Sequence, residues 1–146
     1  MSTIEKLISN KGSDVWTVSP DDSVYEAIKK MNDHSVGALP VVHGDKLVGI
    51  ISERDYARKV ILKDRSSKET RVKEIMTIRV FHTFPKQKIE ECMAVMSEHH
   101  IRHLPVMVDE KLIGIISIGD VVKDIISEQQ FKIEQLENTI SWSETY

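Results

Sequence analysis

The segment Ala38–Ile61, ALPVVHGDKLVGIISERDYARKVI, returns later in the chain as His103–Ile126, HLPVMVDEKLIGIISIGDVVKDII. The two copies are separated by a constant 65 positions, so that Asp55 matches Asp120, and the match needs no gap between residues 15 and 61. Two copies are too few for a solenoid, in which many repeats stack in a row. The repeat therefore predicts two small units that form a pseudo-twofold pair and cover each other's apolar faces.

Each copy has the pattern strand, helix, strand, strand, helix. Short β-branched or aromatic runs at 15–18 and 79–83 predict an opening strand. Apolar residues at helical spacing predict the following helix in each copy: Val24, Ala27, Ile28 and Met31, and Ile89, Cys92, Val95 and Met96. Apolar runs on either side of a polar turn then predict hairpins, at 38–42 with 47–51 and at 104–108 with 112–116. Ser52 and Ser117 are expected to begin the closing helices.

These elements give an α/β (α+β) fold of two β-α-β-β-α units. We expect a first unit at 1–68 with an N-terminal helix, a second unit at 69–130, and a C-terminal helix extension at 131–146. The polar stretch 63–70 reads as the linker between the units, and a short helix is expected at 72–76.

The C-terminal extension has apolar or neutral residues at alternating steps of four and three, the spacing of a heptad seam: Val122, Ile126, Gln129, Ile133, Leu136 and Ile140. This pattern predicts one long helix. Its apolar side either packs back on its own domain or contacts a second copy of the chain, and barely three heptads leave both alternatives open.

Composition limits the classes of function. The 146 residues carry a formal net charge of −3, so no general basic field is present to attract nucleic acid. The longest apolar runs are far shorter than the roughly 20 residues that span a bilayer, and the N-terminus lacks the apolar stretch of a secretory signal. Cys92 is the one cysteine, which fits a reducing compartment. We therefore expect a cytoplasmic protein without nucleic-acid or membrane partners.

The strings GIISERD (49–55) and GIISIGD (114–120) place a serine and then an aspartate where a strand passes into a helix. Capping of the helix alone explains both residue types. A functional interpretation is that the aspartate accepts hydrogen bonds from a ribose diol, while the helix tip and nearby cations bind phosphate. A nucleoside phosphate, with its adenine in an apolar cleft, satisfies both halves of that interpretation.

With the LPVV and LPVM segments before them, these strings resemble the paired CBS (cystathionine-β-synthase-type) domains of IMP dehydrogenases and AMP-activated protein kinase γ subunits. The resemblance covers about residues 1–130. It implies a stand-alone regulatory module that forms a homodimer and binds an adenine nucleotide (AMP, ADP, ATP or NAD(H)) without a metal. It also implies two clefts, each completed by both copies, and an unidentified regulated enzyme as partner.

The resemblance assigns candidate ligand-binding residues to each cleft. The first set is Thr17, Val18, Val36, Gly37, Ala38, Pro40, Ser117, Ile118 and Asp120. The second set is Ser52, Arg54, Asp55, Arg58, Val80, Phe81, His82, Ile101, Arg102, His103 and Pro105. Because the second set is richer in cations, with Lys59 beside it, we expect a longer or more highly charged ligand there.

Other interpretations compete with nucleotide sensing. The clefts would be vacant in a purely structural interaction module, and S-adenosylmethionine is an alternative ligand. No nucleophile elbow, P-loop or zinc dyad occurs, so we expect no catalytic residues and no enzyme activity. The spacing of His99 and His103 suggests a metal pair, but a strand interrupts the helix that would align them, so no metal site is expected. Cys92 lies on an apolar helix face, where a plain core residue is expected.

Overall fold

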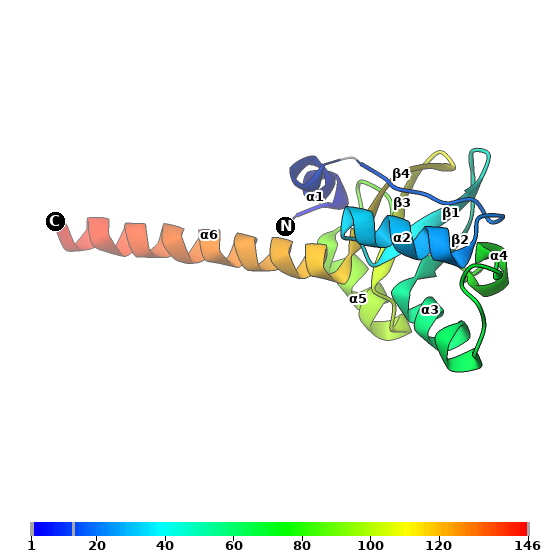
Figure 1. Ribbon diagram of the computed structural model, residues 1–146. Coiled ribbons are helices and arrows are strands. Elements are labelled where there is room, and N and C mark those ends of the chain that lie inside the picture. Colours follow the sequence, from blue (N-terminus) through cyan, green and yellow to red (C-terminus); the bar gives the residue numbers. More distant parts are fainter. Residues whose placement is uncertain (1, 13, 146) are drawn as a thin grey trace.

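The two copies of the repeat form two antiparallel hairpins of matching register (Figure 1). In this computed structural model residues 2–12 and 14–145 are described, with 140–145 described by their backbone only. β1 (Ala38–His43) pairs with β2 (Lys46–Ser52), and β3 (His103–Val108) pairs with β4 (Lys111–Ser117). Both ladders shift register at the same place, after Val41 and after its counterpart 65 positions later. The predicted hairpins are confirmed.

Helices surround the hairpins, and the predicted helices are confirmed. Their bounds are α1 Ile4–Lys11, α2 Val24–His34, α3 Glu53–Lys59, the 3₁₀ turn η1 Ile61–Lys63, α4 Val72–Ile75, α5 Ile89–His99 and α6 Ile118–Thr145. The serine before α3, Ser52, accepts a hydrogen bond from the Asp55 amide, which fixes the start of that helix.

The predicted opening strands at 15–18 and 79–83 are wrong as extended strands, because each is reduced to one bridging residue. The Val18 amide donates to the Pro40 carbonyl (3.1 Å), and the Val42 amide donates to the Val18 carbonyl (2.9 Å). The next rung of a parallel ladder would need an N–H at Pro40, which proline lacks. Thr83 makes the same single bridge on Val106, beside Pro105. The repeated proline therefore stops the ladder after one residue.

Each repeat has its own core of matching composition. Leu39, Val41 and Ile51 are buried in the first cluster, and the residues 65 positions later, Leu104, Val106 and Ile116, are buried in the second. The buried residues of α2, Val24, Ala27 and Met31, likewise match those of α5, Ile89, Cys92 and Met96. Cys92 is a fully buried free thiol, as its place on the apolar face predicted.

The helices before each repeat pack against the other repeat. Ile4 and Leu7 of α1 belong to the second core, whereas Val72 and Ile75 of α4 belong to the first. A two-stranded hairpin with one helix covers too little apolar surface to be stable alone. This reciprocal exchange therefore ties the two repeats into one folding unit.

Two repeat glycines permit this exchange. A Cβ at Gly49 would lie 2.8 Å from the Met76 Sδ, and a Cβ at Gly114 would lie 3.2 Å from the Ile8 Cδ1. Ile8 therefore occupies over the second hairpin the place that Met76 occupies over the first.

The long helix α6 continues the second repeat and then leaves the body of the protein (Figure 1). At its base Val121 is buried and Ile125 packs against the second core, but the residues from 129 to 139 are all exposed. The described side chains thus do not fold back on the domain, and the side chain of Ile140, the last seam position, lies outside the described residues. Among the described residues no helix has the length and apolarity needed to cross a membrane.

The β3–β4 turn generates a stability prediction. Asp109 and Glu110 both have positive φ (49° and 66°), a conformation that glycine adopts at lower cost than other residues. Glu110→Gly should therefore raise the free energy of unfolding by about 0.5–1 kcal/mol, measured by urea denaturation. Glu110→Ala is the control, and it should give no gain. A Glu110→Gly variant less stable than the parent would contradict this account of the turn.

Candidate functional site

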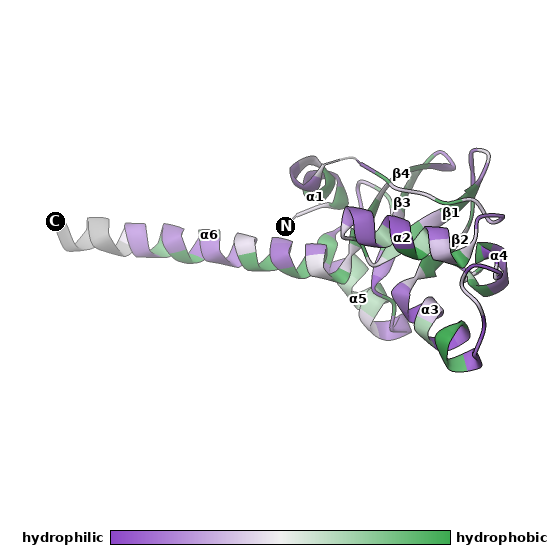
Figure 2. Cartoon of the chain, viewed as in Figure 1, coloured by the Kyte–Doolittle hydropathy of each residue, from purple (hydrophilic) through white to green (hydrophobic). Residues whose placement is uncertain are grey.

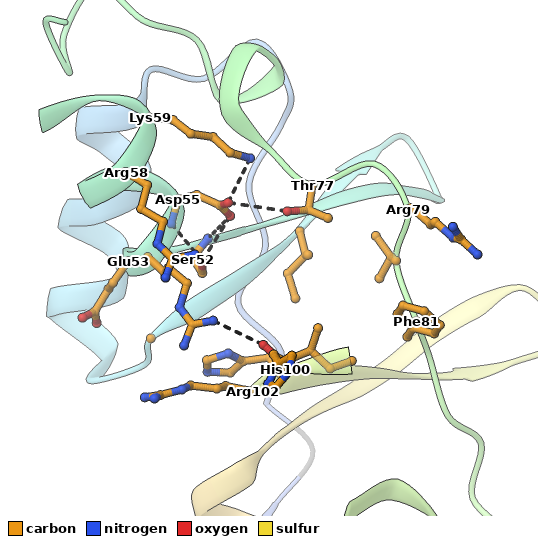
Figure 3. A pocket seen from close by; sticks show the side chains of 16 residues that line it. Ser52, Glu53, Asp55, Arg58, Lys59, Thr77, Arg79, Phe81, His100 and Arg102 are labelled. Atoms are coloured by element: carbon orange, nitrogen blue, oxygen red, sulfur yellow. Dashed lines mark hydrogen bonds and ion pairs between the residues drawn. The ribbon is translucent and has the colours of Figure 1, made fainter. Parts of the chain in front are cut away.

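A cavity lies beside Asp55, between the β2–α3 junction of the first repeat and segments of the second (Figure 3). We call it the Asp55 cleft. Its volume is about 690 Å³, within the range typical of small-molecule sites. Its lining residues are Gly37, Ile50, Ser52, Glu53, Arg54, Asp55, Arg58, Lys59, Thr77, Arg79, Val80, Phe81, His100, Ile101, Arg102 and His103.

Most of the second predicted set meets in this cleft. Nine of its eleven members line the cavity, and the other two, His82 and Pro105, do not. Pro105 is buried in β3, where its carbonyl accepts the Thr83 amide. Gly37, which the sequence placed in the first set, lines this cavity instead.

Thr77 and Arg79 line the cleft but were missed from the sequence. Thr77 exchanges backbone hydrogen bonds with Ile50 (2.9 and 3.0 Å), and this bridge holds the segment after α4 against β2. The sequence signal that could have found Arg79 is its position directly before Val80, a predicted lining residue.

Asp55 makes the capping contacts that the sequence allowed. Its Oδ2 accepts the Ser52 amide (3.0 Å) and the Ser52 hydroxyl (3.1 Å). The second carboxylate oxygen, Oδ1, lies 3.1 Å from the Lys59 Nζ and 3.5 Å from the Thr77 Oγ1 (Figure 3). The Lys59 side chain is 45% exposed, but its ammonium also donates to the Ile75 carbonyl (2.8 Å), so a ligand that binds Oδ1 has to displace Lys59 from both partners.

The cleft carries an excess of positive charge. Its cationic lining residues are Arg54, Arg58, Lys59, Arg79 and Arg102, and its acidic ones are Glu53 and Asp55. The expected contribution of the helix tip is small, because the Glu53 amide already donates to the Gly37 carbonyl and the Asp55 amide to the Ser52 Oγ. Side-chain cations, more than backbone amides, thus make this cavity suitable for anions.

The second candidate site, around Asp120, differs from the Asp55 cleft in both space and charge; we call it the Asp120 cleft, although the cavity beside it is not lined by Asp120 itself. The Lys11 Nζ donates to the Asp120 Oδ2 (2.6 Å) and to the Ile115 carbonyl (2.7 Å). Burial alone would raise the pKa of Asp120, but hydrogen bonds from Lys11 and from Ser117 outweigh it and hold the pKa below its usual value. The nearby cavity, which Lys11 helps to line, measures about 160 Å³.

The first predicted set is only partly brought together. Val36 and Ala38 line the small cavity. The Ser117 hydroxyl accepts the Asp120 amide and the Asp120 carboxylate accepts the Ser117 amide, as in the pair Ser52 and Asp55. Val18 is buried in the first core, and Pro40 is buried in β1. The Thr17 carbonyl accepts a hydrogen bond from the Lys30 ammonium. Ile118 packs against the second core.

The repeat explains why the clefts are unequal. A shift of 65 positions forward takes Arg54 to Gly119 and Lys59 to Asp124. The same shift backward takes Arg102 to Gly37. One counterpart remains cationic, namely Lys123 for Arg58, and the counterpart of Arg79 is Asp14. Four of the five cations therefore have no cationic counterpart at the Asp120 cleft, and Lys11, which reaches Asp120 from α1, is engaged by it.

Two histidines of the second repeat pack at or beside the Asp55 cleft. The His103 ring lies 3.5 Å from the position that a Cβ on Gly37 would take. The His99 ring stacks on Phe81, with centroids 4.2 Å apart, and points to packing. Among the described residues no three His, Cys, Asp or Glu side chains are placed to hold a metal ion.

The burial of His103 generates a pH prediction. Desolvation lowers the pKa of His103 to about 4 from 6.5. The charged groups that face it are Lys11, Asp120, Arg102 and Arg54. Because the unfolded chain binds the proton more tightly, the contribution to stability is complete above pH 6.5 and is lost as the pH falls toward 4, by at most on the order of 3 kcal/mol. His103→Gln should flatten this part of the stability profile.

NMR titration of the imidazole in the folded protein gives the direct measurement. A His103 midpoint near 6.5, or an unchanged pH profile of unfolding in His103→Gln, would show that the ring is not desolvated.

Comparison with known proteins assigns the family. The family model for the CBS domain matches residues 8–62 and 72–127. The CBS domain-containing protein CBSX3, mitochondrial, of Arabidopsis thaliana is 41% identical over 145 residues, covering 92% of this chain and 70% of that protein.

Solved structures agree with this assignment. A Burkholderia ambifaria MC40-6 protein, described as a signal-transduction protein with CBS domains, has a TM-score of 0.84 at 52% identity, covering 88% of this chain and 96% of that one. The hexameric CBS-CP12 protein from bloom-forming cyanobacteria has a TM-score of 0.75 at 27% identity, covering 83% of this chain and 70% of that one. The chain belongs to the CBS domain family and carries two copies of the domain.

Proposed function

We propose that this chain is a regulatory module that binds one adenine nucleotide in the Asp55 cleft and modulates a partner protein. The observation that carries the proposal is the set of five cations around a cavity of about 690 Å³. A cavity of this size accommodates a nucleotide, and its charge favours a ligand with two or more phosphates, such as ADP, ATP or NAD(H).

The lining divides into parts suited to different parts of such a ligand. Ile50, Val80, Phe81 and Ile101 supply apolar surface for an adenine ring. Asp55 presents Oδ1 to a ribose diol once Lys59 has moved aside, and the arginines bind the phosphates. S-adenosylmethionine, the alternative ligand, carries a positive sulfonium that the surrounding cations would repel.

The Asp120 cleft is proposed to stay empty of nucleotide. Its aspartate is neutralised by Lys11 at 2.6 Å, and four of the five phosphate-binding cations have no cationic counterpart there. One nucleotide per chain is therefore the expected stoichiometry. A module with two vacant clefts, used only for protein contacts, is the second candidate.

The matched aspartates give the test of the proposal. Asp55→Asn should weaken ADP binding by roughly 10–100-fold, because a neutral amide is a poorer acceptor for the ribose hydroxyls. Asp120→Asn is the control, since it removes an equivalent capping carboxylate but no ligand contact. Both variants should lower the melting temperature, and only Asp55→Asn should lower affinity in isothermal titration calorimetry.

A second matched pair tests the phosphate contacts. Arg58→Ala should weaken ADP more than adenosine, while Lys123→Ala, at the equivalent place in the other repeat, should leave both affinities unchanged. Parental protein that binds none of AMP, ADP, ATP and NAD(H) at millimolar concentration would reject nucleotide sensing and favour the structural module.

Regulation is proposed to act by population shift. The Asp55 cleft is lined by both repeats, Arg54 from the first and Arg102 from the second, so a ligand that contacts both stabilises one relative arrangement of the repeats. ADP should therefore slow amide hydrogen exchange in the β2–α3 junction and in the segment 100–103 together. Protection confined to one repeat would contradict coupling between them.

Several expectations belong to the same proposal. The module acts on a partner enzyme, is not itself an enzyme, works in the cytoplasm and forms a homodimer. Support for the homodimer comes from two apolar residues at equivalent repeat positions, Ile61 and Ile126, which are 56% and 60% exposed. Large exposed apolar side chains at matching positions are typical of an interface.

A further inference from the structure

The C-terminal helix α6 carries an apolar seam that the rest of the protein leaves uncovered. Val122, Ile126, Ile133 and Leu136 are 38%, 60%, 48% and 64% exposed, although they follow one heptad line. Figure 2 shows hydrophobic residues recurring among hydrophilic ones along this projecting helix. A projecting helix draws most of its stability from packing of an apolar face, and this face has no cover in the described chain.

We propose that α6 pairs with α6 of a second copy as a parallel, in-register, two-stranded coiled coil. The proposal rests on the proposed homodimer and names the surface that holds it together. Three independent features of the seam favour a copy of the same helix over any other occupant.

The aliphatic residues select a parallel pair. In heptad terms the a positions are Ile126 and Ile133, and the d positions are Val122, Gln129 and Leu136. A β-branched residue at a with leucine at d favours two parallel strands, and Ile133 with Leu136 has this pattern.

The polar seam residue selects the register. Gln129 is exposed and stands at a d position, where coiled-coil formation would bury its amide. In an in-register homodimer Gln129 faces Gln129 of the second copy, and each amide then donates to and accepts from the other. A shifted register would set this amide against an aliphatic side chain, at the cost of an unsatisfied polar group.

The flanking charges are self-complementary. Lys132 is at g and Glu137 is at the following e position, and both are exposed. In a parallel dimer g of one helix faces this e of the other, so Lys132 of each helix faces Glu137 of the other helix. The parallel arrangement also keeps both domain bodies at the same end, beside the exposed Val122 and Ile126.

Sedimentation of the full-length protein at micromolar concentration tests the proposal. The parental chain should be a dimer, and Leu136→Glu should weaken its association by at least about a hundredfold, since it places two carboxylates in an apolar seam. Phe131→Glu is the matched control. Phe131 is 61% exposed on the same stretch but lies at f, off the seam, so this variant should remain dimeric.

A charge swap tests the orientation. Lys132→Glu and Glu137→Lys should each weaken dimerisation about tenfold, and the double variant should restore it. Failure of the double variant to rescue would overturn the parallel register.

The remaining outcomes separate the proposals. A Leu136→Glu protein that stays dimeric would overturn the coiled coil and leave the homodimer to the domain bodies. A monomeric parental chain would overturn both, and α6 would then be open to a different protein. ADP affinity is measured in the same variants. If the parental chain does not bind ADP, the nucleotide proposal is rejected and the coiled coil is unaffected.

Discussion

Everything in this structure depends on the fact that a two-stranded hairpin cannot bury its own apolar face. The sequence provides two such hairpins, and the helices α1 and α4 cover their apolar faces by packing across the two repeats. Each packs on the repeat that it does not precede, through Ile4 and Leu7 on one side and Val72 and Ile75 on the other. Close approach at Gly49 and Gly114 makes room for the crossing.

The same crossing builds the clefts. Because the segment after α4 is held on β2 by the Thr77–Ile50 bridge, Arg79 and Phe81 are brought to the cavity beside Asp55. At the other crossing α1 ends at Lys11, and the Lys11 ammonium lies 2.6 Å from the Asp120 carboxylate. The two crossings thus lead to an open cationic cavity beside Asp55 and to an internal ion pair at Asp120.

Duplication followed by divergence of a few charges accounts for the functional asymmetry. Lys59 and Asp124 occupy equivalent positions with opposite charge, and Arg54 and Arg102 face glycine counterparts. The buried positions meanwhile remained apolar, and some pairs are identical, as with Met31 and Met96. Packing constrains a core side chain on every side, whereas a cleft side chain is free to change when its ligand contact is no longer needed.

The sequence by itself determined the repeat, both hairpins, the helix starts at Ser52 and Ser117, the buried Cys92 and most of the Asp55 cleft. The repeat, the hairpins, the helix starts and the buried Cys92 follow from local periodicity, turn chemistry and the pairing of residues 65 positions apart, whereas the residues of the Asp55 cleft were assigned by the resemblance to CBS domains. The sequence did not reveal that the opening strands stop after one residue. This depends on the opening strand pairing along the edge of β1 at which Pro40 would have to donate an N–H.

Only the tertiary structure decided that α1 crosses to the second repeat, that Lys11 reaches Asp120, and that α6 leaves the body with its seam uncovered. These features are contacts between distant residues, with Lys11 and Asp120 109 positions apart, or a lack of contacts, and no local pattern specifies them. Lys11 reads in the sequence as an ordinary charge at a helix end. Its partner is set by the packing of Ile4, Leu7 and Ile8 beneath it, because the burial of those side chains fixes where the end of the helix points.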